Sequence, residues 1–139
     1  MRKRVLLETG FLLALSPRDK NHAWALKILN HSRENRMILH ISPASFIEVS
    51  LILKSHGLSE DKIAQVLRTM EEAINLYTRP RYLSLEPRHV SRAAELRARY
   101  SQLTFFDSLH ASVALEEKLI YMDMDPVVKS VIESEAGSY

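Results

Sequence analysis

The sequence contains no cysteine, which excludes disulfide bonds, thiolate catalysis and cysteine-based zinc sites. Glycine and proline are scarce, at 3 and 5 residues in a chain of 139, so long flexible linkers and low-complexity segments are not expected. No apolar stretch approaches the roughly 20 residues that span a bilayer. What remains is an ordinary globular composition, 46% hydrophobic and 26% charged, which predicts one domain over residues 1–139 with a sizeable core.

Charge of one sign is also lacking, apart from three basic residues at positions 2–4. The net charge of +2 permits nucleic-acid binding but does not indicate it. Basic residues followed by an apolar run are typical of a secretory signal, but Glu8 interrupts that run and no Ala-x-Ala type of cleavage site follows. We therefore expect a cytoplasmic protein without a membrane segment, and Glu8 needs another explanation.

Apolar residues follow strand-like and helix-like patterns in turn along the chain. The short branched run at residues 5–7 (VLL) is typical of a strand buried on both faces. The runs at 37–41 (MILHI) and 119–122 (LIYM) predict two further strands. Shorter strand pieces are predicted at 76–77 and 82–85. Strands separated by helices predict a three-layer α/β/α sandwich around a central, mainly parallel sheet of about four or five strands. Helices are predicted at 11–15, at about 20–34 with Asp19 as the cap, from Ser42-Pro43 to about 55, from Ser59 through Ile74, after Pro87, at about 104–118 and from Pro126.

Acidic residues recur where the predicted strands end or the next helices begin. Glu8 follows the first strand, Asp123 and Asp125 follow the last, Glu48 lies early in the helix after the second strand, and Asp107 lies at the start of the helix TFFDSLHAS. In open parallel sheets, sites form beyond the carboxyl ends of the strands. Each acid alone has an ordinary interpretation as a helix cap, a solvated position or a turn residue. Their joint placement on one edge favours a site.

Carboxylates gathered on one edge need a counter-charge. Two of them about 4 Å apart repel each other by roughly 4 kcal/mol at an effective dielectric near 20. All-oxygen ligands favour Mg²⁺ or Mn²⁺ over zinc or copper. The sequence therefore predicts metal-assisted chemistry on a phosphate ester.

Four blocks, VLLETGFLLAL, SPASFIEVSLIL, LTFFDSLHASVAL and LIYMDMDP, together resemble the PIN domain, the nuclease fold of VapC-type toxins. The resemblance runs from Val5 to about Val131, and TFFDSLHAS is its most specific block. It implies a PIN-like fold and an Mg²⁺- or Mn²⁺-dependent ribonuclease that hydrolyses RNA, with an antitoxin partner and a homodimer if the protein is a toxin. The residues carried over as catalytic and metal-binding are Glu8, Glu48, Asp107 and Asp123, with Asp125 as a further metal ligand and Thr9 as the hydroxyl residue beside the first acid.

Two positions depart from the family pattern. Glu8 stands where the family has aspartate, which lengthens the side chain by one methylene and changes the geometry offered to Mg²⁺. Tyr121 stands where a small hydroxyl residue is common. Both departures favour an alternative, a weakened or inactive PIN-like module that binds RNA or a protein. A phosphatase using Asp123 and Asp125 is a weaker alternative, because that acid pair lies near the end of the sequence and precedes a proline.

Other side chains leave their roles open. His110, three residues after Asp107, could orient that carboxylate, contact RNA or simply pack beside Phe106. Trp24 and Tyr100 lie at helix positions typical of a core, so no aromatic stacking platform is evident. The apolar helix faces around residues 23–29 and 47–53 could contact partners or belong to the core. The arginines that could contact phosphates or pair with acids are Arg79, Arg81, Arg88, Arg92, Arg97 and Arg99.

Overall fold

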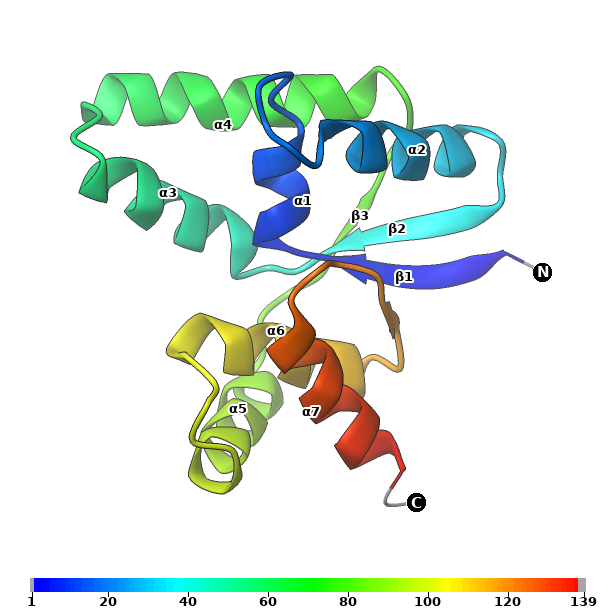
Figure 1. Ribbon diagram of the computed structural model, residues 1–139, viewed down its shortest axis with the longest axis vertical. Helices are drawn as coiled ribbons and strands as arrows, with labels where there is room; N and C mark the ends of the chain where they lie inside the picture. The colour runs from blue at the N-terminus through cyan, green and yellow to red at the C-terminus, as the bar shows by residue number, and fades with distance from the viewer. Residues whose placement is uncertain (1, 138–139) are drawn as a thin grey trace.

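Four parallel strands form the central sheet of the computed structural model, which describes residues 2–137 (Figure 1). The spatial order is β3-β2-β1-β4, and each neighbouring pair is parallel, with Leu7 opposite Ile41 and Leu6 opposite Tyr121. Strands β2 and β3 thus follow β1 on one side, and β4 pairs with the other side of β1. This order places a topological switch point between β1 and β4, where open α/β sheets form their sites. The strands are β1 (Lys3–Leu7), β2 (Met37–Ile41), β3 (Arg81–Tyr82) and β4 (Ile120–Tyr121).

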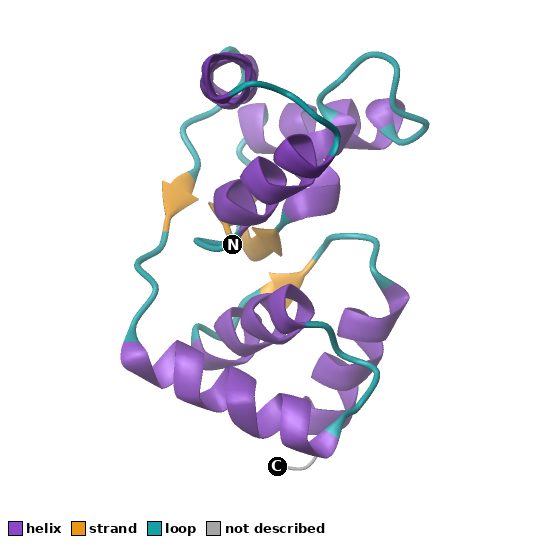
Figure 2. Cartoon of the chain, turned by 90° about the vertical axis from the view of Figure 1, so that its left-hand side faces the viewer, coloured by secondary structure: helices purple, strands orange, loops and turns teal. Residues whose placement is uncertain are grey.

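Helices cover both faces of the sheet, which confirms the predicted three-layer α/β/α sandwich. Helices α1 to α4 lie on one side and α5 to α7 on the other, as both views of the chain show (Figures 1 and 2). Within residues 2–137, no helix is both long and apolar enough to cross a membrane. The helices are α1 (Thr9–Ala14), α2 (His22–Arg33), α3 (Ser45–Ser55), α4 (Glu60–Asn75), α5 (Pro87–Arg99), α6 (Phe105–Glu116) and α7 (Pro126–Ala136).

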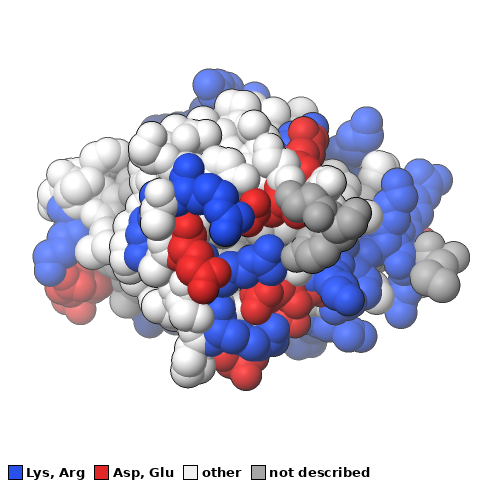
Figure 3. Space-filling view, turned by 90° about the horizontal axis from the view of Figure 1, so that it is seen from below, with Lys and Arg blue, Asp and Glu red and all other residues white. Residues whose placement is uncertain are grey.

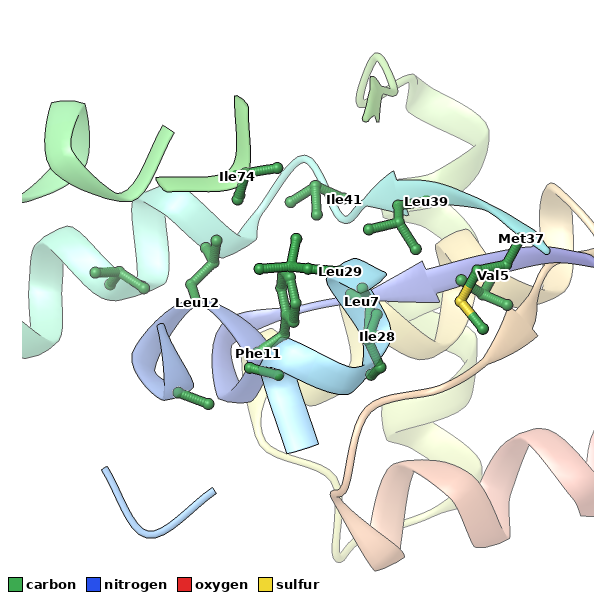
Figure 4. Packing of buried hydrophobic residues seen from close by; sticks show 13 residues of the cluster. Val5, Leu7, Phe11, Leu12, Ile28, Leu29, Met37, Leu39, Ile41 and Ile74 are labelled. Carbon is green, nitrogen blue, oxygen red and sulfur yellow. The ribbon is translucent and has the colours of Figure 1, made fainter. Parts of the chain in front are cut away.

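Strand β1 is buried on both faces, as its branched apolar sequence predicted. Val5 and Leu7 join the core under α1 to α4, where Phe11 and Leu29 pack against them (Figure 4). Leu6 points the other way and packs with residues of α6. Because neighbouring side chains of a strand alternate between faces, only a continuous apolar run can fill both cores.

Three local predictions were wrong. Asp19 does not cap α2, because its carboxylate accepts the N–H of Asn21 in a preceding turn and the helix begins at His22. Ser42 does not cap α3, which begins at Ser45. Leu76 ends α4 and is 79% exposed, so the strand predicted at 76–77 does not form. Ser59 does cap α4, as predicted, by accepting the N–H of Lys62.

Candidate active site

The carboxylate of Asp123 joins the end of β4 to the turn between β1 and α1. Asp123 is buried, and its Oδ2 accepts the backbone N–H of Glu8 at 2.8 Å and that of Phe11 at 3.0 Å. Its Oδ1 accepts the N–H of Met124 at 2.8 Å. Hydrogen bonds to an ionised acceptor are about twice as strong as neutral ones. The side chain therefore fixes the turn that carries Glu8.

Gly10 makes room for that carboxylate. A Cβ atom at position 10 would meet Oδ1 of Asp123 far inside van der Waals contact. Gly10 lies in the first turn of α1, where alanine would otherwise be the better helix former. The close approach of the Asp123 side chain thus accounts for the glycine, a reason that the sequence analysis did not find.

His110 connects the acids of the β1 end and of α3. Its Nε2 donates to Oε1 of Glu48 at 2.8 Å and lies 3.7 Å from Oε2 of Glu8. Its Nδ1 is hydrogen-bonded to the Ser42 hydroxyl at 2.6 Å, and the Thr9 hydroxyl donates to the same oxygen of Glu48. His110 therefore orients a carboxylate, as one of the sequence alternatives proposed, but the carboxylate is Glu48 rather than Asp107.

Glu8 is a buried acid with little compensation. Its Oε1 accepts the Gly10 N–H at 3.3 Å, and the residue is 6% exposed. Burial raises the pKa of Glu8 to about 7, with smaller contributions from the charges of Asp123 and Glu48, while His110 and the Gly10 N–H oppose the rise. The fold holds this carboxylate where a positive charge would stabilise it.

The pKa values of Glu48 and His110 shift in opposite directions. Burial alone would raise the pKa of Glu48, but its hydrogen bonds with His110 and Thr9 outweigh burial and lower it. Burial alone would lower the pKa of His110, but the hydrogen bond to Glu48 and the charges of Glu8, Glu48 and Asp107 raise it above the ordinary histidine value. Together these shifts favour an imidazolium between two carboxylates.

Asp107 and Asp125 serve as helix caps. Oδ2 of Asp107 accepts the Thr104 N–H at 3.2 Å while Oγ1 of Thr104 accepts the Asp107 N–H, which is a reciprocal capping box at the start of α6. Oδ1 of Asp125 accepts the N–H groups of Val127 and Val128 at the start of α7. Asp107 stays half-buried and close enough to act on the His110 charge, whereas Asp125 has no hydrogen bond to the Glu8–His110–Glu48 group.

The predicted acids share one edge of the sheet, but no three of them bring ligand atoms within 4.8 Å of one another among the described residues. Among residues 2–137, the only three potential ligand atoms within 4.8 Å of each other belong to Glu86, His89 and Glu117. That group has a structural explanation: Nδ1 of His89 accepts the Glu86 N–H, so Nε2 carries the proton and donates to Glu117, which also pairs with Arg88. The acids of the sheet edge are linked instead through His110, Thr9 and backbone N–H groups.

The sequence model of the PIN domain matches residues 5–131. The chain belongs to the PIN domain family. No curated protein matches the chain significantly. The family match includes every candidate site residue and overlaps every strand of the sheet, and it confirms the resemblance to the PIN domain drawn from the four sequence blocks. PIN domains are typically metal-dependent nucleases, so membership supports hydrolysis of phosphodiester bonds in nucleic acid.

The donor set of this PIN domain fits a hard divalent cation. Within the described chain, Oε2 of Glu8, Oε2 of Glu48 and Oδ1 of Asp107 accept no hydrogen bond from protein. The Tyr121 hydroxyl is buried near the charges of Glu8 and Asp123, and no hydrogen bond of normal geometry satisfies it within the described chain. Carboxylate oxygens that accept no hydrogen bond, beside a buried hydroxyl, suit a hard divalent cation with bound water.

Most α5 arginines of the PIN domain pair with acids. Arg92 pairs with Glu116 and Arg99 with Glu135, beside the Arg88 pairs already described. Figure 3 shows basic and acidic side chains interleaved on this face. The arrangement is that of a mixed surface rather than a basic track for nucleic acid.

Replacing Gly10 with alanine should destabilise the fold by about 1–3 kcal/mol, because the new methyl group displaces the Asp123 carboxylate from its N–H donors. Urea denaturation measures this free energy. In the Asp123→Ala background the clash is absent, and Gly10→Ala should then be neutral or slightly stabilising. Equal costs in both backgrounds would refute the contact.

The stability of the metal-free protein should fall as pH rises. Glu8 and His110 both have raised pKa values in the fold, so the folded state binds their protons more tightly than the unfolded state. The stability that these two groups contribute is present at low pH. It is lost between pH 4.5 and about 7 for Glu8, and above pH 6.5 for His110. The Glu8 share is on the order of 3 kcal/mol.

Chemical unfolding in EDTA at about pH 5 and about pH 8 tests this dependence. Glu8→Gln should be more stable than the wild type at the higher pH and should show a flatter profile. Glu72→Gln, which changes an exposed acid of α4, is the matched control and should leave the slope unchanged. A Glu8→Gln profile as steep as that of the wild type would contradict the assignment.

Proposed function

We propose that this protein is an Mg²⁺- or Mn²⁺-dependent endoribonuclease, the toxin of a type II toxin–antitoxin pair. The main support is the position of Glu8: a buried carboxylate with a raised pKa at the switch point of a PIN fold, joined through His110 to Glu48. The choice of RNA and of the toxin role rests on the resemblance of the four sequence blocks to VapC-type proteins.

The ligands of the ion would be Glu8, Glu48, Asp107 and Asp123, with Asp125 next to the last of these. When bound, a divalent ion supplies a Lewis acid for the phosphate and activates water as the nucleophile. The protein's own contribution is orientation. Asp123 anchors the turn that presents Glu8, while Thr9 and His110 fix one oxygen of Glu48 and leave its other oxygen free.

A partner surface lies on α3. Ile47 and Leu51 are separated by one helical turn and are 55% and 51% exposed, whereas Ala25, Ile28 and Leu29 of α2 are buried. Of the two helix faces considered from the sequence, the α2 face is core. The α3 face is the proposed contact for an antitoxin or for a second copy in a homodimer, because adjacent exposed apolar residues favour association.

A PIN-like module without catalysis is the second candidate. It is favoured by the ion pairs that His110 forms, since an imidazolium between Glu8 and Glu48 supplies positive charge without a metal. Glu8 in place of aspartate and Tyr121 in place of a small hydroxyl residue point the same way. Such a module would bind RNA or a protein but would not cleave RNA.

Asp107→Asn should abolish Mg²⁺-dependent cleavage of a panel of single-stranded RNAs, because it removes a charged ligand while the asparagine oxygen can still accept the Thr104 N–H. A gel assay with labelled RNA measures the cleavage. Asp61→Asn, at an exposed first-turn acid of α4, is the matched control and should keep full activity. Full activity of the Asp107 variant would refute the assignment.

Calorimetric titration with Mn²⁺ separates the two candidate functions. A nuclease should bind the ion saturably, and Glu8→Gln should weaken the affinity by about tenfold or more. If the protein is instead a PIN-like module without catalysis, it should show no saturable binding of Mn²⁺. Its affinity for RNA should then be independent of metal.

A further inference from the structure

We propose that Phe105 is a stacking platform for a nucleobase that flanks the scissile phosphate, an inference that rests on the proposed nuclease function. Phe105 is 56% exposed, although its neighbour Phe106 packs against Ala44, Ala93 and Leu109. Two adjacent phenylalanines of the same block thus have opposite environments. An exposed aromatic ring at the rim of a nuclease site needs a reason other than core packing.

The ring of Phe105 is exposed and also held in place. It meets Phe106 edge-on, with ring centroids 5.9 Å apart and planes at 88°. The Arg97 guanidinium lies 4.6 Å from its centroid, and Nη1 of Arg97 donates to the Ser108 hydroxyl at 2.6 Å. A fixed aromatic surface loses little entropy when a base stacks on it, and a guanidinium against the ring adds attraction for an anionic strand.

The position of Phe105 relative to the acids favours a base that flanks the scissile phosphate. Phe105 and Asp107 occupy the first turn of α6, with Cα atoms about 5 Å apart from helix geometry. Residues two apart in a helix project to different sides. A strand with its phosphate at the acids would therefore bring a neighbouring nucleotide, with its base splayed out, to Phe105. Proteins commonly recognise single-stranded RNA by stacking such unpaired bases on aromatic rings.

The group that stacks on the Phe105 ring is a nucleobase and not a protein side chain. Arg97 differs from the other arginines of α5, which pair with acids, because it contacts a hydroxyl group and an aromatic ring. Its positive charge thus remains at the rim next to the only strongly exposed phenylalanine among the described residues. A cation over the ring of an exposed phenylalanine matches a stacked base with its phosphate.

The test compares binding of labelled single-stranded RNA in the Asp107→Asn background, which prevents cleavage. Phe105→Leu keeps an apolar side chain but removes the ring, and it should weaken binding about 5- to 100-fold. Phe105→Trp should bind at least as well as the parent. Leu76→Ala is the matched control, because Leu76 is the most exposed large apolar residue of the described chain. Thermal unfolding should be the same for all variants.

An abasic oligonucleotide of equal length distinguishes stacking from phosphate binding. Its affinity should be the same with and without the Phe105 ring. In addition, the tryptophan of Phe105→Trp, in a Trp24→Phe background, should be quenched by RNA and not by the abasic strand, whereas Leu76→Trp should not respond.

Several outcomes would overturn the platform. The platform is rejected if Phe105→Leu binds RNA as tightly as the parent. It is also rejected if Phe105→Leu loses equal affinity for RNA and for the abasic strand. Either result leaves the nuclease assignment intact. Tight, ring-dependent binding by a wild-type protein that does not cleave RNA would support the platform and reject the nuclease. No RNA binding by the wild-type protein would reject both.

Discussion

The candidate site depends on a single buried carboxylate that bridges two strands. Asp123 accepts the N–H of Glu8, which is 115 positions away in the sequence, and also that of Phe11. The turn between β1 and α1 is therefore tied to the end of β4 at the switch point of the sheet. Glu8, Thr9 and their contacts with α3 and α6 all start from this turn, so their geometry follows from the anchor.

The second constraint is the balance of charge. Glu8 and Asp123 are buried at this edge and Glu48 is partly exposed. His110 lies between Glu8 and Glu48. The hydrogen bonds of Glu48 lower its pKa, while burial raises the pKa of Glu8 to about 7. A fold that places an acid in this way gains stability from any cation that binds there, and this links metal binding, protonation and folding at one point.

The helices beneath the sheet divide their charged residues between two tasks. Arg88 and Arg92 pair with Glu117 and Glu116 at the end of α6, and Arg99 pairs with Glu135 of α7. These pairs neutralise that surface and connect the helices. Arg97 packs on Phe105 instead, at the end of α6 that also carries Asp107. Arginines that pair with acids and the arginine that packs on an aromatic ring thus lie along a single helix, although the sequence shows only a series of arginines.

The sequence alone determined the layers of this protein and the edge of the sheet where its acids lie. Branched apolar runs predicted β1, β2 and the location of β4, and acids directly after strands predicted the side of the sheet. Local pattern carries this information because side-chain periodicity depends on near neighbours. Only the tertiary structure decided that Ser42 binds His110 instead of capping α3, that His110 orients Glu48, that Gly10 accommodates Asp123, and that Phe105 is exposed while Phe106 is buried. These contacts join residues far apart in the chain or depend on how α5 and α6 pack, so no local spacing could have revealed them.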